Sequence, residues 1–284
     1  MAAVQEFHYR LPYRVGSPRP GSHPGSSLGA GQEFVSHMNL YDRPDPRRLD
    51  LRASVRNIGG DWLVRVNRQR AAVPVHVIAD VSASMSFGSR KTKLEVAADF
   101  IQALGQSAFR VGDALGMRAF DAAERDDLFM PALLSRGVGS VMAAMLRQCE
   151  TIAGGIDGLE AAAMHFAGRQ GLIFLVSDFH WPLERLGPVL DCFAHAYLVP
   201  MIVWDPAETQ PPTHDALAAL RDAESGARRT LWLRPRLRDR WRDAVAQRRA
   251  KLDQLFAARA VRPFYLSGAF DGEAMSHYFF EAAA

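Results

Sequence analysis

The chain has 284 residues, of which 48% are hydrophobic and 23% are charged, and its formal net charge is +3. This is the composition of a globular protein with enough residues for one large or two modest cores. The charge excess is too small to predict nucleic acid as a partner. The only two cysteines, Cys149 and Cys192, lie in helical apolar patterns without metal-ligand spacing, so we expect two thiols.

No apolar signal core opens the sequence, and its longest apolar runs fall far short of the roughly 20 residues that a membrane helix needs. We therefore expect a cytoplasmic protein with no integral membrane segment.

Residues 1–72 are predicted to form an extended or β-rich segment that packs on the remainder of the chain. Residues 12–31 are rich in Pro, Gly and Ser, which favours loops or extended backbone. Residues 62–69 alternate between apolar and polar side chains, as a half-exposed strand does.

Strands and helices alternate over residues 73–284, which we predict to be a second unit. The predicted strands are 73–80, 114–121, 126–132, 171–179, 197–205, 230–234 and 262–268. The predicted helices are 93–109, 141–152, 158–168, 183–195, 215–223, 236–259 and 271–282. Continuous apolar strands between helices predict an α/β fold: a doubly wound, mostly parallel, Rossmann-like sheet covered on both faces.

Polar side chains follow the strand in the stretch VHVIADVSASM. Asp80, Ser82 and Ser84 supply one carboxylate and two hydroxyls, and Asp178 ends the strongly apolar strand IFLVSD. In the strand order 3-2-1-4-5-6 these two strands are neighbours at the switch point, where ligands bind. Such oxygen ligands suit Mg²⁺ or Mn²⁺. The alternative is that the two serines only cap the following helix.

Three catalytic motifs are incomplete. The G-x-S-x-G match at residues 25–29 lacks the preceding strand and following helix of a nucleophile elbow. A phosphate-binding loop ending at Lys91 would need glycines where Met85 and Arg90 stand. A phosphoaspartate enzyme would need a second aspartate at Ser82.

The combination of D-V-S-A-S-M (80–85) and V-S-D-F (176–179) resembles the metal-ion-dependent adhesion site of von Willebrand factor A (vWA) domains. Four further stretches resemble the MoxR-associated, bacterial domain-of-unknown-function branch of vWA-like proteins: G-S-x-x-G-S-S-L-G-A-G-Q-E-F (21–34), R-P-D-P-R-R-L-D-L-R-A-S-V-R (43–56), V-W-D-P-A-E (203–208) and H-Y-F-F (277–280).

The resemblance implies a non-enzymatic adaptor with a site like the metal-ion-dependent adhesion site. Ser82 and Ser84 would bind the metal directly, Asp80 and Asp178 would act through waters, and an acidic side chain of a protein partner would complete the site. It also implies a MoxR-type AAA+ ATPase as partner and a client complex that is matured, such as methanol dehydrogenase.

The sequence departs from this family at one metal ligand. The family has G-G-T-D where this chain has Gly154, Gly155, Ile156 and Asp157, and isoleucine has no ligand oxygen. Either Asp157, Thr151 or water replaces the threonine, or the crevice binds its partner without metal. On either hypothesis the predicted partner-binding residues are Asp80, Ser82, Ser84, Asp157 and Asp178.

Two other functions stay open. A metal-dependent hydrolase could use the same carboxylates, but it needs a general base that the sequence does not identify. A membrane-peripheral scaffold would use the basic residues of 234–262, although a solvated helix face with i,i+4 ion pairs is the simpler interpretation. His180 lies close to Asp178 in the sequence, without a metal-ligand spacing.

Overall fold

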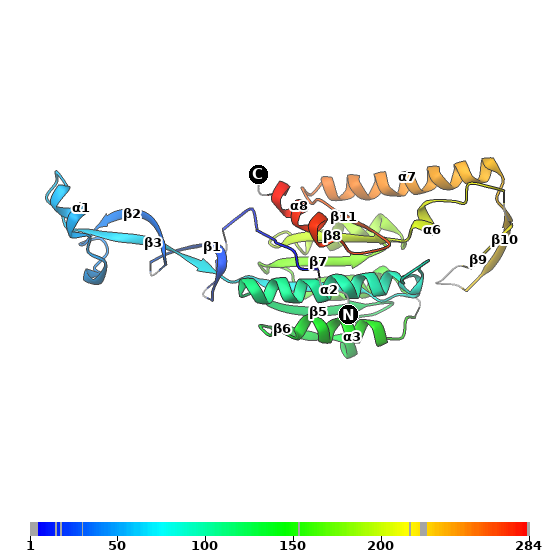
Figure 1. The fold of residues 1–284 in the computed structure, drawn as a ribbon, viewed down its shortest axis with the longest axis horizontal. Coiled ribbons are helices and arrows are strands. Elements are labelled where there is room, and N and C mark those ends of the chain that lie inside the picture. Colours follow the sequence, from blue (N-terminus) through cyan, green and yellow to red (C-terminus); the bar gives the residue numbers. More distant parts are fainter. Residues whose placement is uncertain are drawn as a thin grey trace.

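A six-stranded, mostly parallel sheet forms the centre of the protein, in the order β11-β8-β7-β4-β5-β6 (Figure 1). Its strands are β4 (Pro74–Asp80), β5 (Ala114–Phe120), β6 (Met130–Leu133), β7 (Leu172–Ser177), β8 (Tyr197–Trp204) and β11 (Phe264–Ser267). Only β6 is antiparallel to its neighbour. Counted along the chain from β4, this is the order 3-2-1-4-5-6, which confirms the predicted doubly wound α/β fold.

The computed structural model describes residues 5–14, 16–17, 19–29, 31–152, 154–215, 217–221 and 226–282. Among the helices of these residues, none is both long enough and apolar enough to cross a bilayer.

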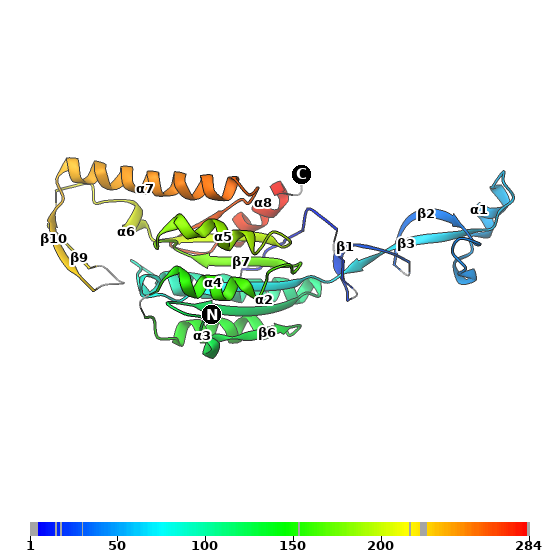
Figure 2. The same cartoon turned by 180° about the vertical axis from the view of Figure 1, so that it is seen from behind.

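Helices cover both faces of the central sheet, because successive side chains of each buried strand point to opposite faces. Val77 of β4 packs in the cluster that includes helices α2 (Lys93–Val111), α3 (Val138–Gln148) and α8 (Gly272–Ala282). Ile78 packs on the other side, in the cluster that includes α4 (Ile156–Met164), α5 (Leu186–Asp191) and α7 (Pro235–Ala257). Figure 2 shows α4 and α5 on the face opposite to α2.

Three strands of the N-terminal segment form a separate antiparallel sheet in the order β1-β3-β2. They are β1 (Pro20–Gly29), β2 (Glu33–Asn39) and β3 (Leu63–Ala71), and the 3-10 helix η1 (Pro46–Arg48) and helix α1 (Leu51–Arg56) connect β2 with β3. The prediction of a β-rich segment is thus correct.

The N-terminal segment packs on the α/β body only near its base. Phe7, Tyr9 and Leu11 are buried in the main core, and the ring of Phe7 stacks on Phe100 of α2. Asp113, just after α2, accepts hydrogen bonds from the Tyr9 hydroxyl at 2.6 Å and the Val73 backbone N–H at 2.7 Å. Its carboxylate also lies 2.7 Å from His23 Nε2 of β1.

Residues 31–70 project away from the body, and we call them the arm (Figures 1 and 2). Every residue of β2 is at least partly exposed, so this strand has no buried face with which to dock. The expectation that the whole N-terminal segment packs on the body is therefore wrong for the arm.

A second correction concerns residues 215–223, which we expected to be helical. Leu217–Arg221 forms strand β9, which pairs antiparallel with β10 (Arg228–Trp232) in a two-stranded ribbon. The Ala- and Leu-rich sequence favours a helix, and pairing with β10 overrides this weak propensity. Residues 216 and 222–223 lie outside the described part of the chain. The ribbon follows the short helix α6 (Pro206–Thr209).

Candidate functional site

Asp80, Ser82, Ser84 and Asp178 lie together at the carboxyl edge of the sheet. Asp80 is the last residue of β4, Asp178 directly follows the adjacent parallel strand β7, and the serines lie on the loop after β4. The Ser82 and Ser84 Oγ atoms are 3.1 Å apart, and Ser84 hydrogen-bonds to Asp178. The structure thus brings these four predicted residues together at one edge of the sheet.

The serines do not cap the helix that follows them. Ser82 precedes the 3-10 helix η2 (Ala83–Ser86) without a side-chain capping bond. Helix α2 begins later, where Thr92 and Glu95 form a reciprocal capping box. The capping alternative is therefore excluded, and the hydroxyls are directed into the polar site instead.

Asp80 is buried, and both of its carboxylate oxygens accept hydrogen bonds. Oδ1 accepts from the Ser82 backbone N–H at 2.9 Å, and Oδ2 accepts from the Ser177 hydroxyl at 2.6 Å. Burial, followed by the nearby Asp178 carboxylate, raises the pKa of Asp80 to about 6, against the effect of these hydrogen bonds. The site thus holds a carboxyl group that titrates near neutral pH.

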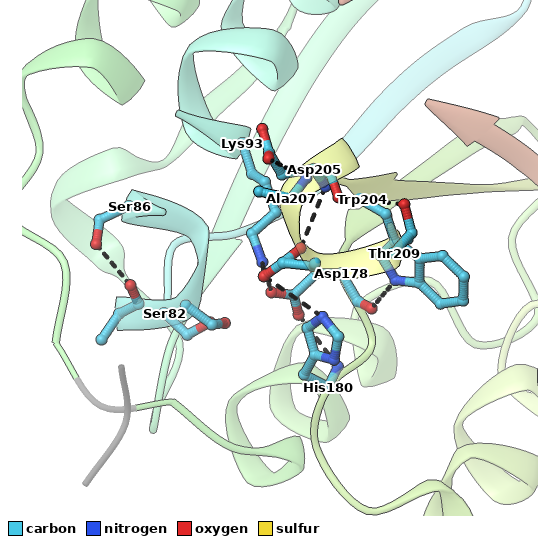
Figure 3. A network of polar contacts seen from close by, with 12 residues as sticks. Ser82, Ser86, Lys93, Asp178, His180, Trp204, Asp205, Ala207 and Thr209 are labelled. Atoms are coloured by element: carbon cyan, nitrogen blue, oxygen red, sulfur yellow. Dashed lines mark hydrogen bonds and ion pairs between the residues drawn. The ribbon is translucent and has the colours of Figure 1, made fainter. Parts of the chain in front are cut away.

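Lys93 is the site residue that the sequence analysis missed. Its side chain is only 2% exposed, and its Nζ lies 2.6 Å from Asp178 Oδ2 and 2.8 Å from Glu208 Oε1 (Figure 3). Burial would lower the pKa of Lys93, but the two carboxylates raise it above its usual value, so the ammonium stays charged. Lys93 is the first residue of α2, where the helix dipole disfavours a cation. This unfavourable position is the one feature of the sequence that could have indicated a special role for Lys93.

Asp178 is held as an anion inside the protein. Burial would raise the pKa of Asp178, but electrostatic interactions with His180 and Lys93 and the hydrogen bonds from Lys93 and Ser84 lower it below its usual value. The next residue, Phe179, is fully buried with a φ of 54°, a left-handed conformation that is strained for a bulky side chain. This backbone turn lets the Asp178 carboxylate also accept from the His180 N–H at 3.1 Å.

The V-W-D-P-A-E stretch (203–208), at the end of β8 and the start of α6, contacts the site through hydrogen bonds and an ion pair (Figure 3). Trp204 Nε1 donates to the Asp178 carbonyl at 2.9 Å. Asp205 caps α6 and accepts from the Ser89 N–H at 2.9 Å, which ties down the loop after β4. Glu208 completes the capping box of α6 and meets Lys93, so this motif positions the charges of the site.

A cavity of about 330 Å³ adjoins the charged network. Its walls are the side chains of Trp204, Trp241 and Val245 together with His180, Glu208, Thr209, Ala244 and Arg248. Glu208 lines this cavity and also pairs with Lys93. Its Oε1 atom, which contacts Lys93, lies 3.8 Å from Nε2 of His180, another residue of the cavity wall. The His180 ring also stacks on Trp204, with ring centroids 6.3 Å apart. The cavity is mostly apolar with charged groups at its rim, as ligand pockets usually are.

The comparisons with known proteins place this architecture in a family. The model of a protein family of unknown function, DUF58, matches residues 42–251, a range that includes β4, β7, β8 and the site. The chain belongs to the DUF58 family. It is 28% identical to the uncharacterised protein Rv1480 of Mycobacterium tuberculosis over 272 residues, covering 92% of this chain and 81% of the relative. An uncharacterised protein of Mycobacterium bovis matches to the same extent.

The solved structure of the conserved hypothetical protein BatB from Bacteroides thetaiotaomicron is similar to this DUF58 chain, with a TM-score of 0.47 and 14% identity. The match covers 75% of this chain and 99% of BatB.

The G-G-I-D loop of this DUF58 protein lies against the serines without supplying an oxygen from Ile156. A Cβ on Gly154 would lie 2.2 Å from the Ser82 Cβ, so the loop and Ser82 touch. Ile156 is buried among apolar side chains on α4. Asp157 is exposed and pairs with Arg185 at 2.7 Å, so it takes no part in the buried network around Lys93.

These residues of the DUF58 site fit a divalent cation poorly. Lys93 occupies one oxygen of Asp178, Ser177 and Ser82 occupy those of Asp80, and Ile156 replaces a hydroxyl ligand. Mg²⁺ needs several oxygens in near-octahedral geometry, and a neighbouring ammonium opposes it electrostatically. Within the described ranges, no group of three or more His, Cys, Asp or Glu side chains is placed to hold a metal ion.

Proposed function

We propose that this DUF58 protein is a non-enzymatic adaptor that binds a protein partner at the edge where β4 and β7 end. The buried Lys93–Asp178 ion pair, extended by the partly exposed Glu208, carries this proposal. Buried charges are costly unless they are paired, and a fold seldom keeps them beside a cavity for stability alone. Here they fix the position of Glu208 at the cavity and of Ser84 beside Asp178.

The adjoining cavity suggests how the partner is recognised. Trp204, Trp241 and Val245 offer apolar walls, and Glu208 and His180 offer polar atoms at the rim. An apolar side chain of the partner would enter the cavity, and its flanking backbone N–H groups would bind Glu208. Buried aromatic anchors of this kind dominate many protein interfaces.

The site as proposed works without a metal ion. The Lys93 ammonium supplies the positive charge beside Asp178 that Mg²⁺ or Mn²⁺ would supply in the vWA-like scheme. The predicted binding residues Asp80, Ser82, Ser84 and Asp178 then act as a preformed polar edge. The exposed Asp157 would contact the partner at its periphery.

A MoxR-type AAA+ ATPase is the partner that we propose, and a protein complex under assembly is the client. Support for both comes from the resemblance of the sequence to MoxR-associated vWA-like proteins, including its V-W-D-P-A-E stretch. The finer resemblance, to the methanol-utilisation accessory protein MxaS, suggests methanol dehydrogenase as the client.

Binding of the purified ATPase to immobilised protein tests this function. We expect Trp241→Ala and Glu208→Gln to weaken binding about tenfold or more, as loss of interface anchors does. Glu281→Gln is the control, since Glu281 pairs with Arg262 on the exposed face of α8. Equal binding by all four proteins would exclude the edge as the docking site. If the wild type does not bind, the ATPase is not the partner.

The pKa of Asp80 favours one competing function, a hydrolase. A carboxyl group that titrates at about 6 lies in the range that suits general acid–base catalysis at neutral pH. Against this function, Asp80 is buried and both of its oxygens are already bonded. Turnover of generic phosphate esters in the presence of Mg²⁺ that disappears in Asp80→Asn would support the hydrolase and refute the adaptor.

A further inference from the structure

The far end of the arm exposes apolar side chains to solvent. This tip comprises residues 41–62, and α1 lies at the extremity of the molecule in both overall views (Figures 1 and 2). The large apolar side chains exposed at the tip are Tyr41, Leu51, Val55, Ile58 and Trp62. Solvent exposure of so many such residues on so short a segment marks a binding surface.

The position of Ile58 is the clearest sign. It occupies the turn closed by the hydrogen bond from the Gly60 N–H to the Asn57 carbonyl, and its side chain is fully exposed. Polar residues and glycine are usual in such turns, so an isoleucine at this corner is unfavourable in water alone. Leu51 and Val55 are one helical turn apart on α1 and are also exposed.

Arginines accompany these apolar residues. Arg52 and Arg56 form a second i,i+4 row on α1, and Arg47 precedes it. All three are exposed, and none forms an ion pair with another residue in the part of the chain that the structure describes. Their charges are therefore available to an anionic partner.

The arm also carries a net positive charge. Residues 31–70 contain eight arginines and five acidic residues, a net charge of +3, while the full chain has 34 basic and 31 acidic residues. The remainder therefore has 26 of each, which leaves it neutral. The neutral remainder still includes the basic helix α7, with seven basic and three acidic residues, so both the arm and α7 can attract an anionic surface.

We infer that the arm tip is a membrane-docking element that inserts Ile58, Val55 and Leu51 between the headgroups of anionic lipids. The tip lies at the extremity of the molecule and exposes large apolar side chains, which suits insertion into a fluid lipid layer. Interspersed arginines reach lipid phosphates, and Trp62 suits the interfacial depth that tryptophan prefers. This surface is separate from the partner-binding edge and does not depend on the proposed adaptor function.

Vesicle flotation with the full chain tests the inference. Vesicles of phosphatidylcholine alone are compared with vesicles of phosphatidylcholine and phosphatidylglycerol. We expect the protein to float only with the anionic vesicles, and high salt to release it. Ile58→Asp, and Arg52→Glu combined with Arg56→Glu, should each lower the bound fraction about tenfold or more. Met164→Asp, at an exposed apolar residue of α4, is the matched control and should still float.

A spectroscopic measurement locates the contact. Trp62 is the only tryptophan of the arm, so the vesicle-induced blue shift of fluorescence should vanish in Trp62→Phe while flotation persists. No flotation of the wild type, or equal flotation of the tip variants, would overturn the inference. A concentration-dependent dimer in light scattering that Ile58→Asp abolishes, without vesicle binding, would assign the tip to a second copy of the chain instead.

Discussion

Lys93 and Asp178 form an ion pair in the interior of the protein, with 2.6 Å between the ammonium nitrogen and a carboxylate oxygen. Their side chains are 2% and 0% exposed, and they come from residues 85 positions apart in the sequence. The pair joins the first turn of α2 to the end of β7. It therefore fixes the geometry of the proposed binding edge.

Removal of the lysine charge should destabilise the fold. Lys93→Met leaves the carboxylates of Asp178 and Glu208 without their buried partner, which costs about 3–5 kcal/mol of unfolding free energy. Addition of Asp178→Asn should recover part of this loss. Urea denaturation measures both effects. Lys91→Met is the matched control, because Lys91 makes an exposed pair with Asp99 worth about 1 kcal/mol or less.

The Asp80 carboxyl should make stability depend on pH. Its folded pKa of about 6 exceeds the unfolded value of 3.8, so the folded state binds more protons between these values. The stability that Asp80 contributes is thus present at low pH and is lost as pH rises through about 6.

Asp80→Asn should consequently be close to neutral at pH 4 and should stabilise the protein at pH 7, by about 1–3 kcal/mol. Unfolding free energies of both proteins across this pH range measure the difference. A gap that shrinks as pH rises would contradict the assigned direction of the shift.

Metal binding should appear only after the site is altered. Titration calorimetry of the wild type with Mg²⁺ or Mn²⁺ should give no binding heat, because Lys93 opposes the cation and Ile156 lacks an oxygen. Lys93→Met combined with Ile156→Thr removes both obstacles and should bind Mn²⁺. Wild-type binding heat that disappears in Asp80→Asn would instead support the metal site that the family resemblance implies.

The two adjacent glycines of the G-G-I-D loop should respond differently to substitution by alanine: Gly154→Ala should destabilise the protein, and Gly155→Ala should not. Gly154→Ala would place a Cβ 2.2 Å from that of Ser82, so the loop or the serine must move, at about 1–3 kcal/mol. A Cβ on Gly155 meets nothing within 4 Å, and its φ of −172° is ordinary extended backbone. Thermal unfolding compares the two. Equal losses would show that the close approach to Ser82 does not matter.

Local sequence patterns were sufficient for the fold and for half of the site. Apolar strands that alternate with helices predicted a doubly wound, mostly parallel sheet, and the observed strand order brings Asp80 and Asp178 together. The sequence analysis did not identify Lys93 as a site residue, because its role depends on contacts with Asp178 and Glu208, which are distant in sequence. Without the fold, a lysine at the start of a helix is indistinguishable from a solvated one.

The two errors in the fold have a related cause. Residues 217–221 look helical until β10 is available as a partner, and the arm looks able to pack until its strand β2 proves to have no buried residue. In both segments the tertiary partner, or its absence, decided the structure. Local periodicity carries no information about that partner.

Helix α2 is one unbroken helix that runs from the partner-binding edge to the base of the arm. It begins at Lys93 in the binding edge and ends just before Asp113, which holds Tyr9, His23 and Val73 at the base of the arm. Its 19 residues span roughly 28 Å. Because one continuous and largely buried helix runs from Lys93 to Val111, two residues before Asp113, the binding edge and the base of the arm share a single structural support.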